Sequence, residues 1–272
     1  MGAINHLRFR RKQFEKFLQE RYANADVYSY GSAEPPVAKG PYSTAYLAHE
    51  GAIAHKWDQY LDAYDALLAP VRYGIPGTDK PLRFLEIGVS HGGSLEVWRD
   101  YLGPDAIIHG LDIDPRCANA VAPEVATVHI GSQADPSMLR QVVAAMGGVD
   151  VVLDDGSHMA EHQRISFDTL WPMLTWNGLY MCEDVHTAYW PTYGGGYHRP
   201  GQFMSVTKQV IDGMHGWYAK LPPSELHRRG QHEVGAVHVY DSLVAFEKRR
   251  RQQPTWTVRG TGSLNDQGPE PS

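Results

Sequence analysis

The chain contains little cysteine: Cys117 and Cys182 are the only two among 272 residues. Two cysteines cannot build a disulfide framework, and Cys182 lies in an apolar run typical of a core strand. The sequence also has no apolar run of 18 residues, so it predicts no membrane span. Its first residues, MGAINHLRFRRKQF, are charged and contain no signal-peptide core, which leads us to expect a cytoplasmic protein.

Basic residues form no extended block. The chain has 25 Lys and Arg against 31 Asp and Glu, a formal net charge of −6. The densest cationic run is EKRRR at 247–251, which we interpret as a solvated strand end. Nucleic-acid binding normally needs a basic surface, so the composition argues against a nucleic-acid partner.

Apolar segments alternate with helical ones at intervals of about 20–30 residues, as in a doubly wound α/β sheet with helices on both faces. The hydrophobic fraction of 42% is enough for one sizeable core. We expect an antiparallel hairpin within VGAVHVYDSLVAFEK at 234–248. The strands of the mostly parallel sheet are predicted at 82–88, 107–112, 126–130, 149–154 and 178–183.

Three parts of the chain follow from this pattern. Residues 1–50 are expected to form an N-terminal helix and a Tyr/Pro/Gly-rich loop, 51–251 the catalytic domain, and 252–272 a disordered tail. The further predicted elements are helices at 5–24, 46–69, 159–171 and 203–220, and loops at 25–45 and 190–202.

A nucleotide-type pocket is predicted from three successive strand ends. FLEIGVSHGGS at 84–94 reads as a strand, a glycine turn and a helix start, which suits close approach of a ligand to the backbone. It lacks the G-x-G-x-x-G spacing, which disfavours NAD. The next strand ends in Asp112 and Asp114, suitable for a ribose diol, and the third in Gln133 and Asp135, suitable for an adenine edge.

Carboxylates follow two later strands, in VLDDGSH at 152–158 and CEDVH at 182–186. Carboxylates at the ends of neighbouring strands can converge on one hard cation such as Mg²⁺, and His158 is close enough to act as a base beside it. Two simpler interpretations stay open. Asp154-Asp155 can cap the following helix, and His158 can be a hydrogen-bonding residue at its entry.

Together these segments resemble the metal-dependent sugar O-methyltransferases, similar to the macrocin and mycinamicin enzymes and to rhamnosyl O-methyltransferases. The resemblance covers about residues 52–250 and rests on FLEIGVSHGGS, GLDID, GSQAD, LDDGSH, CEDVH and VHVYDSLVAFEK. HKWDQY at 55–60 is similar to the entry segment of the family. The family consists of class I S-adenosylmethionine (SAM) methyltransferases, so the resemblance implies a Rossmann-like fold.

The resemblance also implies a site. Asp155, Glu183 and Asp184 would bind Mg²⁺, with Mn²⁺ as a substitute, and His158 would be the general base beside Asp155. The predicted SAM-binding residues are Glu86, Gly88, Ser90, Gly92, Ser94, Asp112, Asp114, Ser132, Gln133, Asp135 and Asp154. Ser132 departs from the family pattern, in which this position often carries an acid. The acceptor would meet Lys56 and the loop aromatics Tyr189, Trp190, Tyr193 and Tyr197, which otherwise pack on one another.

We therefore expect methyl transfer from SAM to a sugar hydroxyl of a glycosylated natural product, such as an antibiotic, or of a glycan. The partner is then a small-molecule or glycan acceptor, and a homo-oligomer is expected. Two alternatives remain: a catechol-type O-methyltransferase acting on an aromatic diol, and a SAM-binding subunit without catalysis. The presence of Asp155, His158, Glu183 and Asp184 disfavours the second alternative.

Overall fold

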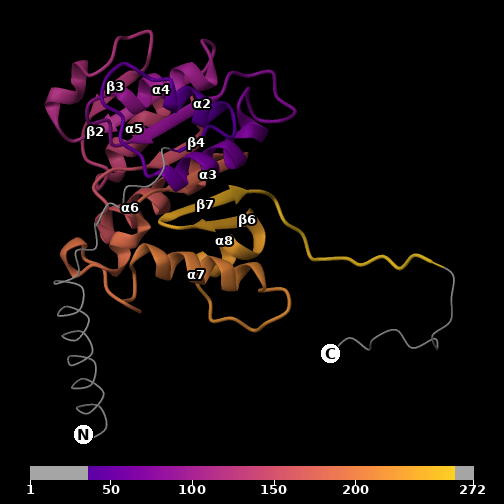
Figure 1. Cartoon of the computed structure of the whole chain (residues 1–272). Helices are drawn as coiled ribbons and strands as arrows, with labels where there is room; N and C mark the ends of the chain where they lie inside the picture. The colour runs from indigo at the N-terminus through magenta and orange to yellow at the C-terminus, as the bar shows by residue number, and fades with distance from the viewer. Residues whose placement is uncertain (1–35, 261–272) are drawn as a thin grey trace, which may run out of the picture. The chain divides into compact units, whose positions relative to one another are not determined.

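The computed structural model describes residues 36–260, so the predicted helix at 5–24 lies outside the described residues. A seven-stranded sheet in the order β3-β2-β1-β4-β5-β7-β6 lies at the centre of the unit formed by Ala38 onward (Figure 1). The first five strands run parallel: β1 (Arg83–Ile87), β2 (Ile107–Asp112), β3 (Thr127–Ile130), β4 (Val149–Asp154) and β5 (Leu174–Cys182). The hairpin of β6 (Val234–Tyr240) and β7 (Leu243–Lys248) joins β5 antiparallel through β7.

Both faces of the sheet are covered by helices, because neighbouring strand residues point to opposite faces and both sets are apolar. Phe84 packs in one core with α2 (Pro41–Leu47), α3 (Asp58–Leu68) and α4 (Gly93–Leu102). Its neighbour Leu85 belongs to the opposite core. The helices of that second core are α5 (Pro136–Met146), α6 (Ala160–Leu170), α7 (Phe203–Met214) and α8 (Glu225–Glu233).

The chain order of the strands reverses at β1, which pairs with β2 on one side and with β4 on the other. Ile87 at the end of β1 lies opposite both Leu111 and Asp154, and Asp154 lies opposite Cys182. The carboxyl ends of four parallel strands therefore meet at one edge. In open α/β sheets this switch point is where ligands bind.

The predicted boundaries are wrong in the N-terminal part. Residues 41–45 of the predicted loop belong to α2, where Pro41 occupies the first helical position, a place that needs no backbone N–H. The predicted helix at 46–69 is two helices, α2 and α3, separated by residues 48–57 without helix. This separating segment carries Lys56 and Trp57 into the site described below.

The C-terminal part confirms the hairpin and corrects two other predictions. The helix expected at 203–220 ends at Met214, and α8 was not predicted; it starts after Pro222-Pro223, with Ser224 accepting from the His227 N–H. Lys248 is not solvated: it is 3% exposed and donates to the carbonyls of Trp171 and Leu174. Strand β5 also begins at 174, earlier than predicted.

The remaining predicted segments agree with the structure, except that short 3-10 turns occur within or next to them. The loop at 190–202 contains one 3-10 turn, η5 (Pro191–Tyr193), preceded by η4 (Val185–Tyr189). The other 3-10 turns are η1 (Ala69–Val71), η2 (Pro115–Asn119) and η3 (Trp171–Met173). Residues 252–260 of the predicted tail are exposed and have neither helix nor strand. Within 36–260, every helix is too short or too polar to cross a membrane.

Candidate active site

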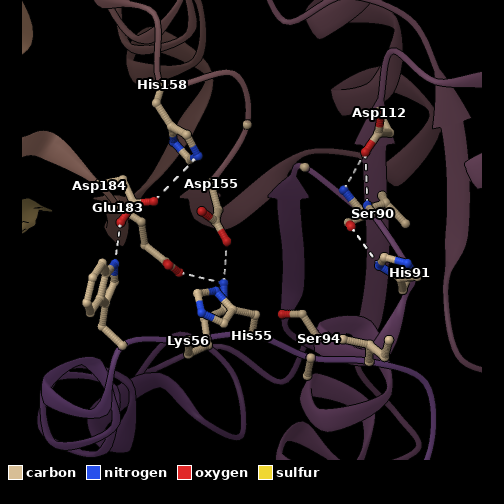
Figure 2. Close-up of a pocket in the computed structure, with 16 residues that line it drawn as sticks. His55, Lys56, Ser90, His91, Ser94, Asp112, Asp155, His158, Glu183 and Asp184 are labelled. Carbon is tan, nitrogen blue, oxygen red and sulfur yellow. Dashed lines mark hydrogen bonds and ion pairs between the residues drawn. The ribbon is translucent and has the colours of Figure 1, made fainter. Parts of the chain in front are cut away.

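A cavity of about 310 Å³ opens at the switch point of the sheet (Figure 2). Residues 53–57 line one wall, and residues 88–91 with Ser94 and Asp112 line another. The acidic strand ends Asp155, Glu183 and Asp184 complete it together with Gly156 and His158. The glycine-turn residues and the acidic residues, which the sequence placed in two separate motifs, thus share one cavity.

Gly88 is required by the geometry of the glycine turn. Its φ is +97°, and a Cβ built on it would lie 2.2 Å from the carbonyl oxygen of Asp155. The Gly88 N–H donates to the Leu111 carbonyl, and the Asp155 N–H donates to the Ile87 carbonyl. The turn after β1 is therefore packed directly against the segment after β4, which joins the two halves of the cavity.

Asp112 holds the glycine turn as well as lining the cavity. Its Oδ2 accepts from the N–H groups of Val89 (2.8 Å) and Ser90 (3.0 Å), and its Oδ1 accepts from Asp114 N–H. Burial raises the pKa of Asp112, but these N–H donors outweigh burial and hold the pKa below its usual range. The carboxylate is therefore ionised and fixed at the place where a ribose was predicted.

Glu86 lies behind Ser94 and is fully buried. Its Oε1 accepts from Ser94 Oγ at 2.6 Å and from Trp98 Nε1 at 3.3 Å, while its buried Oε2 has no hydrogen-bond partner. Burial raises the pKa of Glu86 above its usual range. Glu86 does not itself line the cavity, but Ser94, to which it is bonded, does. A buried carboxylate oxygen without a partner fits a cationic ligand group, as the predicted cofactor carries.

Lys56 occupies the space between the two acidic strand ends (Figure 2). Its Nζ donates to Asp155 Oδ2 at 2.5 Å and to Glu183 Oε1 at 2.8 Å. Tyr64 OH also donates to Glu183 Oε1. Burial and the nearby Asp155 raise the pKa of Glu183, against the opposing effect of Lys56. Burial lowers the pKa of Lys56, but Asp155 and Glu183 more than reverse this, so the ammonium stays charged.

Asp184 is positioned by aromatic donors. It accepts from Tyr60 OH at 2.8 Å and from Trp57 Nε1 at 3.1 Å. His158 Nε2 lies 3.5 Å from Asp184 Oδ2, and His158 Nδ1 is buried without a hydrogen-bond partner. Asp155, His158 and Asp184 each offer one donor atom within 4.8 Å of the others. Two of the three predicted ligands are thus grouped with His158, while Glu183 faces Lys56 and Tyr64.

The helix-cap interpretation of the acidic pair is wrong. The N-cap of α6 is Met159, with no side-chain hydrogen bond to the helix. Asp154 is instead buried, with Gln133 Nε2 2.9 Å from its Oδ1 and Tyr180 OH 3.1 Å from its Oδ2. Burial raises the pKa of Asp154 to about 6. Asp154 and Gln133 therefore support the turn that presents Asp155.

The predicted adenine-side residues Ser132, Gln133 and Asp135 lie outside the cavity lining in this structure. The same holds for Glu86, Gly92, Asp114 and Asp154. Asp114 begins η2 and pairs with Arg116, and Asp135 begins α5 by accepting from the Ser137 N–H. Ser132 Oγ accepts from the Ala134 N–H. Gly92 begins α4 with φ +87°. These contacts are structural, and a direct role of these residues in cofactor binding stays a prediction.

Two of the four predicted acceptor aromatics, Trp190 and Tyr193, form part of a row of rings. The row runs from Trp57 to His186 (6.3 Å between centroids), from His186 to Trp190 (4.8 Å) and from Trp190 to Tyr193 (5.8 Å). Tyr189 and Tyr197 are 40% and 54% exposed. Trp57, but none of the four loop aromatics, lines the cavity. Lys56 lines it as well, with its ammonium directed at carboxylates.

Several site residues were not predicted. His55, Trp57 and His91 line the cavity, and Tyr60 and Tyr64 donate to its acids. A signal for the two tyrosines was present: they are spaced by four residues, which puts both on one face of a helix. A buried tyrosine hydroxyl needs a polar partner, and here the partners are the acids after β5.

Comparison with known proteins identifies the family. Residues 85–185 match the family described as a methyltransferase domain. The chain is 35% identical over 207 residues to 8-demethyl-8-alpha-L-rhamnosyl tetracenomycin-C 2'-O-methyltransferase of Streptomyces olivaceus, covering 71% of this chain and 52% of the relative. It is 35% identical over 203 residues to demethylmacrocin O-methyltransferase of Streptomyces fradiae, covering 68% and 50%.

A solved structure is similar as well. The MycE methyltransferase of the mycinamycin biosynthetic pathway, in complex with Mg, SAH and mycinamycin VI, matches with a TM-score of 0.62 and 30% identity. The match covers 83% of this chain and 58% of that one. The chain spans about half the length of the curated relatives it matches. On these grounds the chain belongs to the family of class I methyltransferases that includes the macrocin, mycinamicin and rhamnosyl tetracenomycin sugar O-methyltransferases.

Proposed function

We propose that the protein transfers a methyl group from SAM to a sugar hydroxyl of a glycosylated small molecule, with Mg²⁺ bound at the acidic strand ends. The observation that carries the proposal is the shared cavity. The glycine turn with Asp112 lines the same space as the acids Asp155, Glu183 and Asp184. Residues that would hold a methyl donor therefore lie beside residues that would hold a divalent ion, next to room for an acceptor.

The residues present fit both groups. SAM carries a sulfonium and an ammonium, and Glu86 offers a buried, unpartnered carboxylate oxygen on the side of the glycine turn. Asp112, held ionised by backbone N–H groups, suits the ribose diol. Carboxylate oxygens are the ligands that Mg²⁺ prefers, and Asp155 and Asp184 already lie within reach of one ion. We assign Glu183 as the third carboxylate ligand.

The chain's own residues then have distinct tasks. When bound, Mg²⁺ would supply a Lewis acid next to the acceptor hydroxyl and SAM an electrophilic methyl carbon. His158 Nε2 takes the hydroxyl proton, because Nδ1 is buried and cannot meet an acceptor. The tyrosine and tryptophan donors Tyr60 and Trp57 hold Asp184 in place beside His158. Holding the acceptor hydroxyl in line with the methyl group is worth several kcal/mol of the barrier to methyl transfer, up to about 7–11 at the ideal limit.

Support for a sugar acceptor comes from the relatives. The tetracenomycin relative is an O-methyltransferase named for a rhamnosyl tetracenomycin, and the macrocin and mycinamicin relatives are O-methyltransferases as well. The aromatic row beginning at Trp57 suits the apolar face of a sugar ring. A role in antibiotic biosynthesis is part of the same proposal.

Calorimetric titration tests the cofactor half of the proposal. SAM and its demethylated product should bind the full-length chain, NAD should not, and Asp112→Ala should weaken SAM binding by about tenfold or more. Mn²⁺ affinity should stay near that of the parent in this variant, because Asp112 is not among the metal donors. Binding of NAD without binding of SAM would overturn the assignment.

A further inference from the structure

A buried lysine beside a metal site needs an explanation. The Lys56 side chain is 1% exposed, and its Nζ lies 2.5 Å from Asp155, 2.8 Å from Glu183 and 3.6 Å from Glu86. It comes from residues 48–57, the non-helical segment between α2 and α3. The ammonium has three N–H donors, and two of them go to acids assigned above as metal ligands.

Charge balance makes Lys56 unusual. Glu86, Asp155, Glu183 and Asp184 bring four acidic groups to one site. Among residues 36–260, Lys56 is the only lysine or arginine that forms an ion pair with any of the four. Glu86 and Glu183 are buried, and Asp155 and Asp184 are half-buried. Carboxylates in such a place repel one another and lose hydration when no counter-charge is present. A permanent cation at this point therefore stabilises the acids when no divalent ion is bound.

The same two acids are assigned to metal binding. Asp155 Oδ2 and Glu183 Oε1 accept from Lys56, so one oxygen of each carboxylate is engaged by the ammonium. A divalent ion that binds both acids, through either oxygen of each, comes close to a positive charge that already lies at hydrogen-bond distance from both. Glu86 Oε1, at 3.6 Å, is the remaining acid on which the ammonium can settle.

We propose that Lys56 is the resident counter-ion of the acidic site, which a divalent cation must displace from Asp155 and Glu183, so that Lys56 sets the metal affinity. The inference rests on the proposed function, because it requires a divalent ion at these carboxylates. Lys56 therefore acts on the metal indirectly, by binding and positioning Asp155 and Glu183. The resemblance had instead suggested that Lys56 contacts the acceptor.

Two roles of Lys56 predict opposite changes in metal affinity when its charge is removed. If Lys56 competes with the metal, its removal strengthens metal binding, because like charges a few ångströms apart repel strongly even at an intermediate effective dielectric. If Lys56 only fixes the positions of the carboxylates, its removal lets them move apart and weakens metal binding. The sign of the change in metal affinity therefore separates the two roles.

The test is calorimetric titration of the full-length protein with MnCl₂ and, separately, with MgCl₂. Lys56→Met, neutral and of similar length, should bind Mn²⁺ at least about tenfold more tightly than the parent. Lys56→Arg, which keeps the charge, should bind no more tightly than the parent. Lys39→Met removes an exposed lysine paired with Asp62 and should leave the affinity unchanged.

The outcomes are distinguishable. Equal or weaker Mn²⁺ binding by folded Lys56→Met, judged by its circular dichroism, overturns the inference and leaves the proposed function intact. If the parent binds SAM but neither Mn²⁺ nor Mg²⁺, the metal part of the proposed function fails instead. Should Lys56→Met not fold, Lys56→Gln replaces it with the same expected gain, and Lys56→Arg binding tighter than the parent contradicts the inference independently.

Discussion

At the scale of single residues, the proposed role of His158 as general base can be tested most directly. Its Nε2 lies near Asp184, whereas its Nδ1 is buried, so one nitrogen is available to an acceptor. A base contributes about 10²–10⁴-fold to rate. His158→Ala should lower kcat by that factor, with Mn²⁺ and SAM affinities near those of the parent. Steady-state kinetics together with calorimetry checks this.

Two results would contradict the role of His158 as base. Loss of Mn²⁺ binding in His158→Ala would make His158 a metal ligand, which its grouping with Asp155 and Asp184 allows geometrically. Activity within about threefold of the parent would remove His158 from the mechanism and favour an acceptor that ionises easily, such as a catechol. Asp155→Asn is the matched control, because it should abolish metal binding.

Residues of the cavity could be predicted where adjacent residues form a motif. Asp112, Asp155, Asp184 and His158 come from such motifs and all line the cavity, while their roles stay predictions. Lys56 was assigned to the acceptor from the resemblance of HKWDQY, whereas its acidic partners lie 99 and 127 residues away along the chain, beyond any local pattern. The spacing of Tyr60 and Tyr64 puts them on one helix face, but their partners Asp184 and Glu183 could not be predicted because they also lie far away along the chain.

At the scale of elements, the turn between β1 and α4 joins the two halves of the site. Gly88→Ala should weaken SAM binding by about tenfold or more and lower stability, because the new methyl group would meet the Asp155 carbonyl at a positive φ. Gly103→Ala is the control: its φ is +84°, but a Cβ there would have no atom within 4 Å. Calorimetry with SAM and urea unfolding measure both variants.

Equal effects of the two glycine substitutions would contradict this explanation. Gly103→Ala carries the backbone strain of a positive φ without the clash, so its stability should fall and its SAM affinity should not. If Gly88→Ala binds SAM like the parent, the turn after β1 does not support the cofactor pocket, and the site must be placed elsewhere.

Elements with a strong periodic signal were predicted well, and those shaped by packing were not. Strands β2 and β4 match their predicted ranges, because continuous apolar runs mark buried parallel strands. The segment at 48–57 was expected to be helical, but its backbone Ala52 N–H donates to Glu96, and the Tyr46 hydroxyl bonds Ala54 and Lys56. These tertiary contacts override local helix propensity.

At the scale of the whole molecule, the buried His109 and its half-buried partner His129 make stability depend on pH. His109 on β2 is 7% exposed and its Nδ1 lies 2.9 Å from His129 Nε2 on β3. Burial lowers the pKa of His109 to about 4, with a further contribution from His129. Because the folded pKa lies below the unfolded value of about 6.5, stability is full above that value and falls as pH drops toward about 4.

Urea unfolding at about pH 7.5 and about pH 5 measures this effect, which should be on the order of 1–2 kcal/mol. His109→Gln cannot ionise, so the loss of unfolding free energy between the two pH values should be smaller than in the parent. The carboxylates titrate in both proteins, so their contributions cancel when the loss of unfolding free energy in His109→Gln is subtracted from that in the parent. An equal loss in the two proteins would show that the histidine pair does not control acid stability.

We propose that one cavity brings a methyl donor, a divalent ion and a sugar hydroxyl together. The most direct measurement is transfer of an isotopically labelled methyl group from SAM by the full-length protein, with rhamnosides, macrolide glycosides and catechols as acceptors. We expect label on a sugar oxygen, dependence on Mg²⁺ or Mn²⁺, loss with EDTA, and no transfer by Asp155→Asn. Transfer that persists in full after chelation, or label on catechols alone, would contradict this proposal.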